Sequence, residues 1–432
     1  MITQAHRSSI LHFLDHPEKV GVDNAVQYFE DGLLFVEDGC VSKLGSFDSL
    51  KAYLTEDVEF INHENALLMP GFIDTHIHYP QTEMVASYGE QLLEWLNNYT
   101  FPVEGKFKDK EYAKGIAEIF VRELLRAGTT TALVFGTVHK ESVDAFFEVV
   151  QSKNLRMIAG KVMMDRHAPD FLLDTSDTSY TDSKVLIEKW HNNGRLRYAV
   201  TPRFAPTSTR EQLERAGQLL SEYPSLYLHT HLSENPNEIA WVKELFPECN
   251  NYLDTYDNAG LLGRRSVFAH CIHLEDAEWK RLAETQSGIA FCPTSNLFLG
   301  SGLFNIKRSI EENINVGIAT DVGGGTSFSI LETLNEAYKV IQLRGETLSP
   351  FTSFYLATLG GAETLDLADT IGNFEIGKEA DFIILDKAGT PLMDFRMQQT
   401  TSLFEELFVF SMLGDDRTIR QTWSMGQLVH ER

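Results

Sequence analysis

The sequence predicts an α/β fold in which a (β/α)8 TIM-like barrel is joined to a small β-sandwich domain formed by both chain ends. In the central region, strand-like and helix-like patterns alternate over roughly 300 residues, which is typical of a barrel. In both flanks, short runs of alternating apolar and polar residues surround turn pairs, which is typical of antiparallel strands. A doubly wound sheet is the competing fold, but no Gly-x-Gly-x-x-Gly turn follows any strand candidate.

The eight barrel strands are predicted from runs rich in apolar and β-branched residues. Helical spacing of apolar residues separates several of them, and Gly128 is a C-cap candidate for the helix that precedes the second strand. The strand candidates are residues 72–78, 129–136, 156–164, 196–204, 225–231, 265–271, 288–293 and 315–321. Helices are expected at residues 210–223, 237–246 and 276–285.

The flanks predict one small β domain that the barrel interrupts. Residues 32–39 read as part of a hairpin that ends in an Asp-Gly turn. Near the other end, residues 380–385 and 421–430 also have strand patterns, the latter with a turn. We therefore expect residues 1–68 and 371–432 to pair as a composite β-sandwich domain, and residues 69–370 to form the barrel.

Composition and charge exclude several classes of protein. The chain has 432 residues, of which 43% are hydrophobic and 23% charged, as in ordinary globular enzymes. Its net charge of −25 disfavours nucleic acid and anionic membranes as partners and favours a neutral small molecule. No membrane span or secretory leader is recognisable, and the four scattered cysteines suit a reducing environment, so we expect a cytoplasmic protein.

Polar residues gather where the predicted barrel strands end. Because barrel active sites assemble at the C-terminal ends of the strands, these side chains should converge although they are far apart in the sequence. On the first strand, two histidines one residue apart point to the same face, about 6.6 Å apart along the strand. The residues concerned are Asp74, His76, His78, Arg203, His231, Glu234, His270 and Asp321.

Three imidazoles and one carboxylate from this set predict a single metal site. His76, His78, His231 and Asp321 suit Zn²⁺, with Fe²⁺ as the alternative, and the ion would lower the pKa of a bound water towards ~7. Glu234 is placed to reach that water without being a ligand. His270 is expected to hydrogen-bond the resulting hydroxide or to orient the attacked atom.

Two other residues could alter this ligand set. His229 lies one pleat before His231 and could replace it, although His231 is closer to the strand end. Lys161 could be carbamylated to bridge two metals, but it lies on the third strand, away from the other candidates, which favours one metal.

Each candidate also has a purely structural interpretation. The two histidines could be a half-buried polar pair, His270 could be structural, and Asp321 could cap a helix before Gly323. Arg203 could pair with a structural carboxylate. Trp95, with its leucine neighbours at residues 92, 93 and 96, could simply belong to a packed helix.

Several motifs together resemble the amidohydrolase superfamily, in its single-metal deaminase branch. The resemblance extends over essentially the whole chain, and no metal or proton-transfer position departs from the pattern. The motifs are PGFIDTHIHYPQ (70–81), LLEWL (92–96), YTFP (99–102), TPRF (201–204), THLSE (230–234), CPTSNL (292–297), GGG (323–325) and IGKEADF (376–382).

This resemblance implies zinc on the four proposed ligands and proton transfer by Glu234 and Asp321. It implies a purine held by Gln81, Arg203 and Phe204, with Trp95 as a second stacking candidate, and with His231 and Glu234 also facing the substrate. The expected reaction is hydrolysis of guanine to xanthine and ammonia by attack of the activated water at C2. A homodimer is also implied.

Two alternative functions stay open at this point. The same chemistry could act on another ring amine or halide, such as a triazine, cytosine or an adenosine derivative. Alternatively, the chain could be a non-catalytic barrel scaffold, although such proteins usually lose metal ligands. The separate zinc fold that deaminates cytidine is excluded, since the chain contains no Cys-x-x-Cys.

Overall fold

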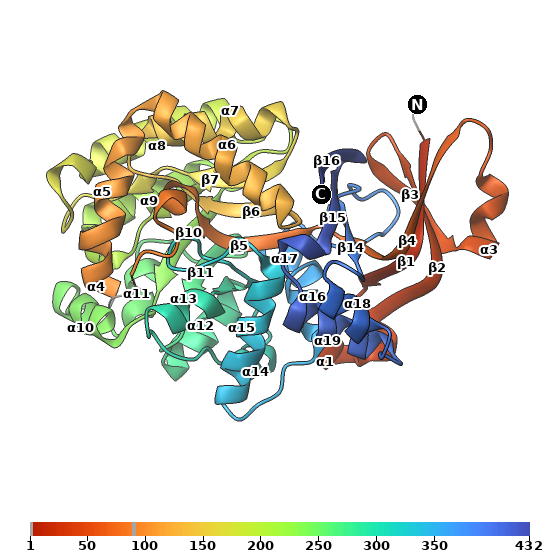
Figure 1. Cartoon of the computed structure of the whole chain (residues 1–432). Coiled ribbons are helices and arrows are strands. Elements are labelled where there is room, and N and C mark those ends of the chain that lie inside the picture. The colour runs from red at the N-terminus through yellow and green to blue at the C-terminus, as the bar shows by residue number, and fades with distance from the viewer. Residues whose placement is uncertain (1–2, 89–91) are drawn as a thin grey trace.

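The computed structural model describes residues 3–88 and 92–432. Figure 1 shows a barrel surrounded by helices beside a smaller domain, on which both chain termini lie. The strand β5 (Phe72–His78) leads directly from the smaller domain into the barrel.

Eight parallel strand positions form the barrel, as predicted. Their order in the sheet is β13-β12-β11-β10-β9-β7-β6-β5. The two ends of this order meet, because the Thr75 hydroxyl donates to the Ile318 carbonyl and the Asp321 amide donates to the His76 carbonyl. After β5, the strands are β6 (Thr129–Phe135), β7 (Arg156–Gly160), β9 (Arg197–Pro202), β10 (Tyr227–Leu232), β11 (Ser266–His270), β12 (Gly288–Phe291) and β13 (Val316–Ile318).

Helices cover the outside of the barrel. The barrel strands are therefore buried on both faces, as β6 is, which explains the nearly continuous apolar runs of the sequence. The longer helices around the barrel are α6 (Lys110–Arg126), α7 (Lys140–Ser152), α8 (Ser176–Trp190), α9 (Arg210–Glu222), α10 (Pro236–Leu245), α12 (Asp276–Thr285) and α15 (Ile330–Leu343). Shorter ones are α11 (Tyr252–Asp257), α13 (Pro293–Phe298), α14 (Ile306–Glu311), α16 (Pro350–Leu356) and α17 (Leu359–Thr364).

Short helical turns after β5 build the wall above the barrel mouth. They are η2 (Tyr79–Met84), α4 (Leu92–Trp95), the π-helical turn η3 (Leu96–Thr100), α5 (Phe101–Glu104) and η4 (Gly105–Lys108). Later turns are η5 (Asp170–Leu172) and η6 (Ala205–Thr207). The side chains of Leu92 and Leu93 lie outside the described part of the chain, so the packed-helix interpretation of this segment is tested only at its other positions.

Both chain ends contribute to one seven-stranded sheet, with the order β16-β15-β14-β4-β1-β2-β3. The predicted hairpin is confirmed: β2 and β3 meet at Asp38 and Gly39, both with positive φ. The strands are β1 (Thr3–Phe13), β2 (Val26–Glu37), β3 (Cys40–Ser46), β4 (Val58–Pro70), β14 (Phe382–Asp386), β15 (Ile419–Ser424) and β16 (Gln427–Glu431).

This end domain differs from the predicted sandwich in that its strands belong to a single, strongly curled sheet. His6 of β1 and Trp423 of β15 are three strand positions apart, yet their ring centroids are 4.8 Å apart. Since neighbouring strands lie about 4.8 Å apart, a flat sheet would separate them by roughly 14 Å. The sheet therefore folds over its own apolar core.

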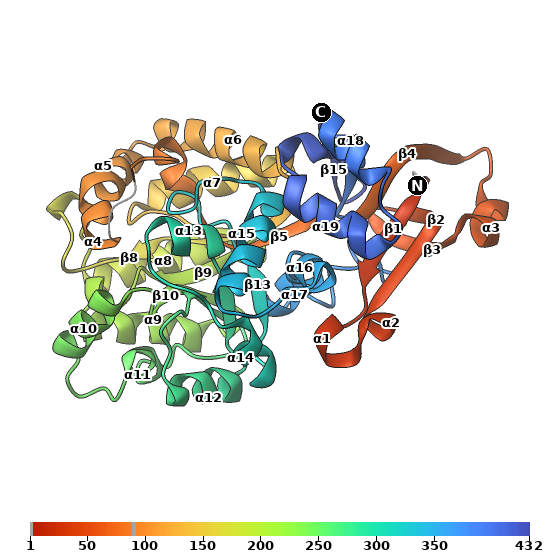
Figure 2. The ribbon, with the colours of Figure 1, turned by 60° about the horizontal axis from the view of Figure 1, so that its bottom comes forward.

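The remaining helices lie next to this sheet or between it and the barrel. Figure 2 shows α19 (Leu403–Leu413) between the barrel helices and the strands of the end domain. These helices are α1 (Pro17–Val20), α2 (Val22–Ala25), α3 (Phe47–Leu50), the turn η1 (Lys51–Tyr53), α18 (Pro391–Met397), α19 (Leu403–Leu413) and the turn η7 (Asp416–Thr418). The domain boundaries at residues 68/69 and 370/371 stay a prediction; β4 continues to Pro70, just past the first.

The third predicted strand is interrupted at Lys161 between β7 and the two-residue strand β8 (Val162–Met163). The Lys161 ammonium is buried, forms an ion pair with Asp174 and donates to the Val162 carbonyl at 3.1 Å. This charged partner explains why a lysine is tolerated there, and it favours the one-metal interpretation. Among the described residues, no helix is both long and apolar enough to span a membrane.

A buried charge network joins the barrel to the end domain. Arg195, just before β9, donates to Glu379 at 2.7 Å, pairs with Asp381 and donates to the Ser424 hydroxyl at 2.8 Å. Arg156 of β7 donates to the same Glu379 at 2.7 Å. The two bodies are therefore held together by charged groups withdrawn from water.

Replacing Arg195 by alanine should lower the free energy of unfolding by about 3–5 kcal/mol, because Asp381 and Glu379 would lose a buried counter-charge. Thermal and urea unfolding would measure this effect. Arg197→Ala is the matched control, because the Arg197 guanidinium donates to backbone carbonyls of Gly194 and Leu196. Equal losses in the two variants would contradict a special role for the network.

Candidate active site and metal centre

The predicted site residues converge at the C-terminal ends of the barrel strands, where most of them line one pocket. His76 lies behind the pocket wall and is fully buried. The lining residues are His78, Gln81, Trp95, Leu96, Arg203, Phe204, His231, Glu234, His270, Leu299, Asp321 and Gly324.

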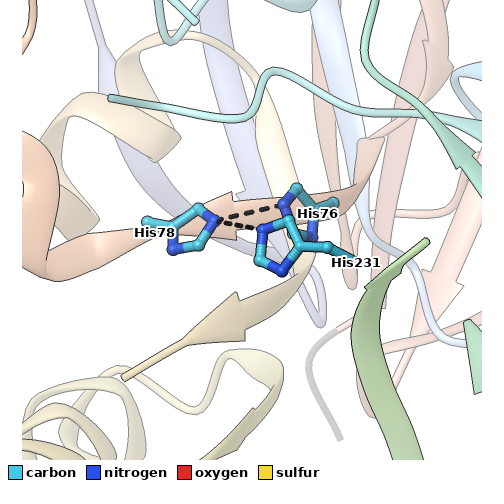
Figure 3. A group of neighbouring side chains, drawn as sticks. All are labelled: His76, His78 and His231. Atoms are coloured by element: carbon cyan, nitrogen blue, oxygen red, sulfur yellow. Dashed lines mark hydrogen bonds between the residues drawn. The ribbon is translucent and has the colours of Figure 1, made fainter. Parts of the chain in front are cut away.

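Four ligand atoms face one another at the base of this pocket. The Nε2 atom of His78 lies 3.1 Å from that of His76 and 3.3 Å from that of His231. Figure 3 shows the three imidazoles turned towards one another. The Oδ1 atom of Asp321 lies 3.2 Å from His76 Nε2 and 3.4 Å from His78 Nε2. β5 supplies both neighbouring histidines because alternate side chains of a strand share a face, as predicted.

Second partners fix the orientation of two of these imidazoles. His231 Nδ1 lies 2.7 Å from the Arg203 carbonyl oxygen, so Nδ1 carries the proton and Nε2 keeps its lone pair. His76 Nδ1 lies 2.6 Å from His229 Nε2. His229, the alternative ligand in the sequence analysis, thus lies behind His76 and orients it.

The donor set fits a divalent cation. Burial lowers the pKa of His76, His78 and His231 well below the ordinary value, so the imidazoles are neutral and their lone pairs are available. Ligands about 2.0–2.1 Å from a tetrahedral zinc ion are about 3.3 Å from one another, which matches the observed spacing. Four donor atoms at this spacing could therefore hold one divalent cation.

Asp321 is not a helix cap. The next helix, α15, begins at Ile330 and is capped by Ser329. One carboxylate oxygen of Asp321 faces the two histidines of β5, whereas Oδ2 lies 3.8 Å from His270 Nε2. Burial raises the pKa of Asp321 above its ordinary value, so this group readily accepts a proton.

Glu234 and His270 form the second part of the site. His270 Nε2 lies 3.5 Å from Glu234 Oε2, and His270 Nδ1 lies 2.9 Å from the Asn296 side-chain oxygen. Burial raises the pKa of Glu234, as expected of a carboxyl that exchanges protons near neutral pH. Burial by itself lowers the pKa of His270, but the charges of Glu234 and Asp321 outweigh it and the net shift is upward.

Ser301 contacts Glu234 from the loop after α13, and its hydroxyl donates to Glu234 Oε1 at 2.9 Å. This bond stabilises the ionised carboxylate and so opposes the rise that burial causes in the pKa of Glu234. The sequence analysis did not single out Ser301, because nothing in a lone serine between two glycines indicates its partner.

Ser301→Ala should lower kcat about tenfold and move the acidic limb of the pH–activity profile to higher pH. The carboxylate form of Glu234 is stabilised less in this variant, so its pKa rises and the active form appears only at higher pH. A pH profile of kcat/KM measures the shift. A profile that moves to lower pH, or does not move, would contradict this role.

Gln81 and Arg203 are held by a carboxylate that the sequence analysis missed. Arg203 Nη1 donates to both oxygens of Glu104, at 2.8 and 3.0 Å, and Gln81 Nε2 donates to Glu104 Oε1 at 3.1 Å. The structural interpretation of Arg203 and the binding interpretation are therefore both supported, because the residue is ion-paired and also lines the pocket.

Two aromatic residues complete the wall. Trp95 and Phe204 are buried in one apolar cluster and both line the pocket. Among the described residues, the Trp95 indole Nε1 has no hydrogen-bond partner. Trp95 is thus both packed in an apolar cluster and part of the pocket wall, so its two interpretations are compatible.

Asp74 connects the two ends of the barrel sheet. Its carboxylate accepts the Thr320 hydroxyl and the backbone amides of Thr320 and His76, each amide at 3.2 Å. Burial raises the pKa of Asp74 to about 7. By holding the start of the β13 loop against β5, Asp74 places Asp321 beside the histidines.

The chain belongs to the amidohydrolase family, whose model matches residues 67–429. The guanine deaminase of Escherichia coli (strain K12) is 56% identical to it over 97% of this chain and 95% of that protein. The solved structure of E. coli guanine deaminase superposes with a TM-score of 0.96 at 53% identity, covering 100% of both chains. The structure of guanine deaminase from C. acetobutylicum with bound guanine in the active site has a TM-score of 0.90 at 30% identity and covers 99% of this chain and 100% of that one.

Proposed function

We propose that this protein hydrolyses guanine to xanthine and ammonia. The observation that carries the proposal is a pocket lined by three residues of a possible metal site, by Glu234 and by an arginine–glutamine pair, all of which face one small volume. The guanine deaminases that match nearly the full length of the chain support guanine as the substrate. The single-metal deaminase chemistry expected from the sequence fits the same residues.

We propose that His76, His78, His231 and Asp321 hold one zinc ion. When bound, the ion supplies a Lewis acid that lowers the pKa of a water molecule towards ~7. The neutral imidazoles and the single carboxylate favour zinc, with Fe²⁺ as the alternative.

Glu234 transfers the first proton in this proposal. It takes a proton from the attacking water and delivers it to ring nitrogen N3 while the water oxygen bonds to C2. Its raised pKa allows the carboxyl to hold that proton briefly and release it again. The Ser301 hydroxyl keeps the carboxylate turned towards the pocket.

Asp321 and His270 act on the tetrahedral adduct. Asp321 Oδ2, which faces His270 rather than the ligand group, accepts the remaining hydroxyl proton and passes it to the amino group. The C2–N bond breaks, ammonia leaves, and a carbonyl forms at C2. His270 hydrogen-bonds the new oxygen, and its own orientation is fixed by Asn296.

Arg203 and Gln81 recognise the other edge of the purine. Arg203 can donate to the O6 carbonyl, and the Gln81 amide offers a donor and an acceptor to the amide-like N1–C6 edge. Phe204 and Trp95 contact the ring faces. An unpaired buried polar group is costly, so a ring that lacks the O6 acceptor is rejected.

The proposal is tested on purified protein by metal analysis combined with the guanine-to-xanthine change in ultraviolet absorbance. We expect one zinc ion per chain and faster ammonia release from guanine than from adenine, cytosine or melamine. If one of those other compounds is hydrolysed faster than guanine, that compound is the substrate instead. Metal-free protein without hydrolytic activity after zinc addition would favour a scaffold.

We further propose a homodimer in the cytoplasm. Exposed apolar side chains on α18 and α19 support a second copy as partner: Leu392, Phe395 and Phe404 are 61%, 63% and 49% exposed. The four cysteines are all free thiols, which suits a reducing compartment. Sedimentation analysis tests the oligomer, and a monomer at micromolar concentration would exclude it.

A further inference from the structure

Glu104 lies between the two polar groups that face the purine edge, although it does not line the pocket itself. Its carboxylate accepts two bonds from Arg203 Nη1 and one from Gln81 Nε2. Gln81 is held at its other end as well, since the Gly323 amide donates to Gln81 Oε1 at 3.4 Å. The carboxylate therefore decides which way the Gln81 amide faces and where the guanidinium lies.

The Glu104–Arg203 pair is almost completely withdrawn from water. Their side chains are 1% and 3% exposed. A buried ion without a counter-charge is strongly disfavoured, so Glu104 keeps the purine edge of the pocket electrically neutral. The other charged or titratable groups that line the pocket lie on the proposed metal side; they are His78, His231, Glu234, His270 and Asp321.

We propose that Glu104 is a positioning residue that also sets the charge preference of the pocket for a neutral purine. The inference rests on the proposed function and deepens it. Guanine is neutral at physiological pH, whereas xanthine, with its additional ring N–H and carbonyl, is more acidic and becomes an anion under mildly alkaline conditions. A guanidinium whose charge is already balanced binds the neutral substrate without retaining the anionic product.

The test is Glu104→Gln in the metal-loaded enzyme at mildly alkaline pH. Loss of the anchor should raise KM for guanine by roughly 10–100-fold with a smaller fall in kcat, because binding geometry is affected more than proton transfer. Loss of the negative charge should make inhibition by xanthine, an anion at this pH, at least about tenfold stronger relative to inhibition by hypoxanthine, which is largely neutral. This inhibition ratio does not depend on how much active protein survives.

Two further variants separate geometry, charge and folding. Glu104→Asp keeps the charge on a shorter side chain, so it should raise KM but leave the xanthine-to-hypoxanthine ratio near that of the wild type. Glu94→Gln removes an exposed carboxylate from the same segment and should change neither quantity. If Glu104→Gln folds too poorly to assay, the inhibition ratio of Glu104→Asp still tests the proposal. Stronger inhibition by xanthine relative to hypoxanthine in that variant, which keeps the negative charge, would contradict the proposed charge balance.

Some outcomes would overturn the proposal. An unchanged inhibition ratio in Glu104→Gln, or equal losses of kcat and metal content with an unchanged KM, would show a merely structural role. Failure of the wild-type enzyme to hydrolyse guanine would instead refute the proposed function, and the two failures are therefore distinguishable.

Discussion

Glu234→Gln should keep the bound metal and lower kcat for guanine by roughly 10²–10⁴-fold or more, the loss expected when an acid–base group is removed. Glutamine has the same size and preserves the contact with the Ser301 hydroxyl, but it can neither take a proton from water nor deliver one to the ring. Because Glu234 is not among the proposed ligands, the metal content should stay at that of the wild type.

Steady-state ammonia release and metal analysis of the same preparations measure the two quantities together. Glu244→Gln is the matched control, because this glutamate is exposed on α10 and its neutralisation should leave kcat unchanged. Near-normal turnover of Glu234→Gln would dismiss its role in proton transfer. Loss of metal together with activity would mean that Glu234 supports the ion rather than the chemistry.

His78→Ala should abolish stoichiometric metal binding and lower guanine turnover by more than about 10³-fold. His78 Nε2 is close to the ligand atoms of all three other proposed ligands, at 3.1, 3.3 and 3.4 Å. Removing one of few ligands lowers the affinity for the ion far more than removing a residue that only hydrogen-bonds a ligand, which costs about 10–100-fold in affinity. Treatment of the wild type with a chelator should produce the same loss of activity, reversible by zinc.

A graded comparison makes this second result specific. His229→Asn removes the partner of His76 Nδ1 but no proposed ligand, so its metal affinity should fall by about 10–100-fold rather than vanish. His430→Asn, on the half-buried outer strand β16, should have no effect on metal content. Full metal occupancy in His78→Ala would show that this histidine is not a metal ligand.

The convergence of the proposed metal ligands could be predicted because each lies on a barrel strand or shortly after one. The order of residues specifies that His76 and His78 share a face, and the parallel topology brings His231 and Asp321 to the same end of the barrel. The composite end domain could be predicted for a similar reason, because the strand runs and the Asp38–Gly39 turn are local patterns. Its curling into one sheet brings His6 and Trp423, from opposite ends of the chain, into contact, which no local pattern indicates.

The groups that hold the site residues could not be predicted in the same way. Glu104 is 99 positions from Arg203 and lies in short helical turns without a regular pattern. Ser301 is 67 positions from Glu234. Their partners depend on the paths of loops, which short-range patterns do not encode.

Strand periodicity and the polar ends of the strands were thus sufficient to define the barrel and to bring the proposed metal ligands and proton carriers to one end of it, because both signals are local to each strand. Folding alone selected the ion pair of Arg203, the hydrogen bond to Glu234 and the interruption at Lys161. Each of these requires two distant segments to bury complementary polar groups against each other, and the free energy of that burial exists only in the assembled protein.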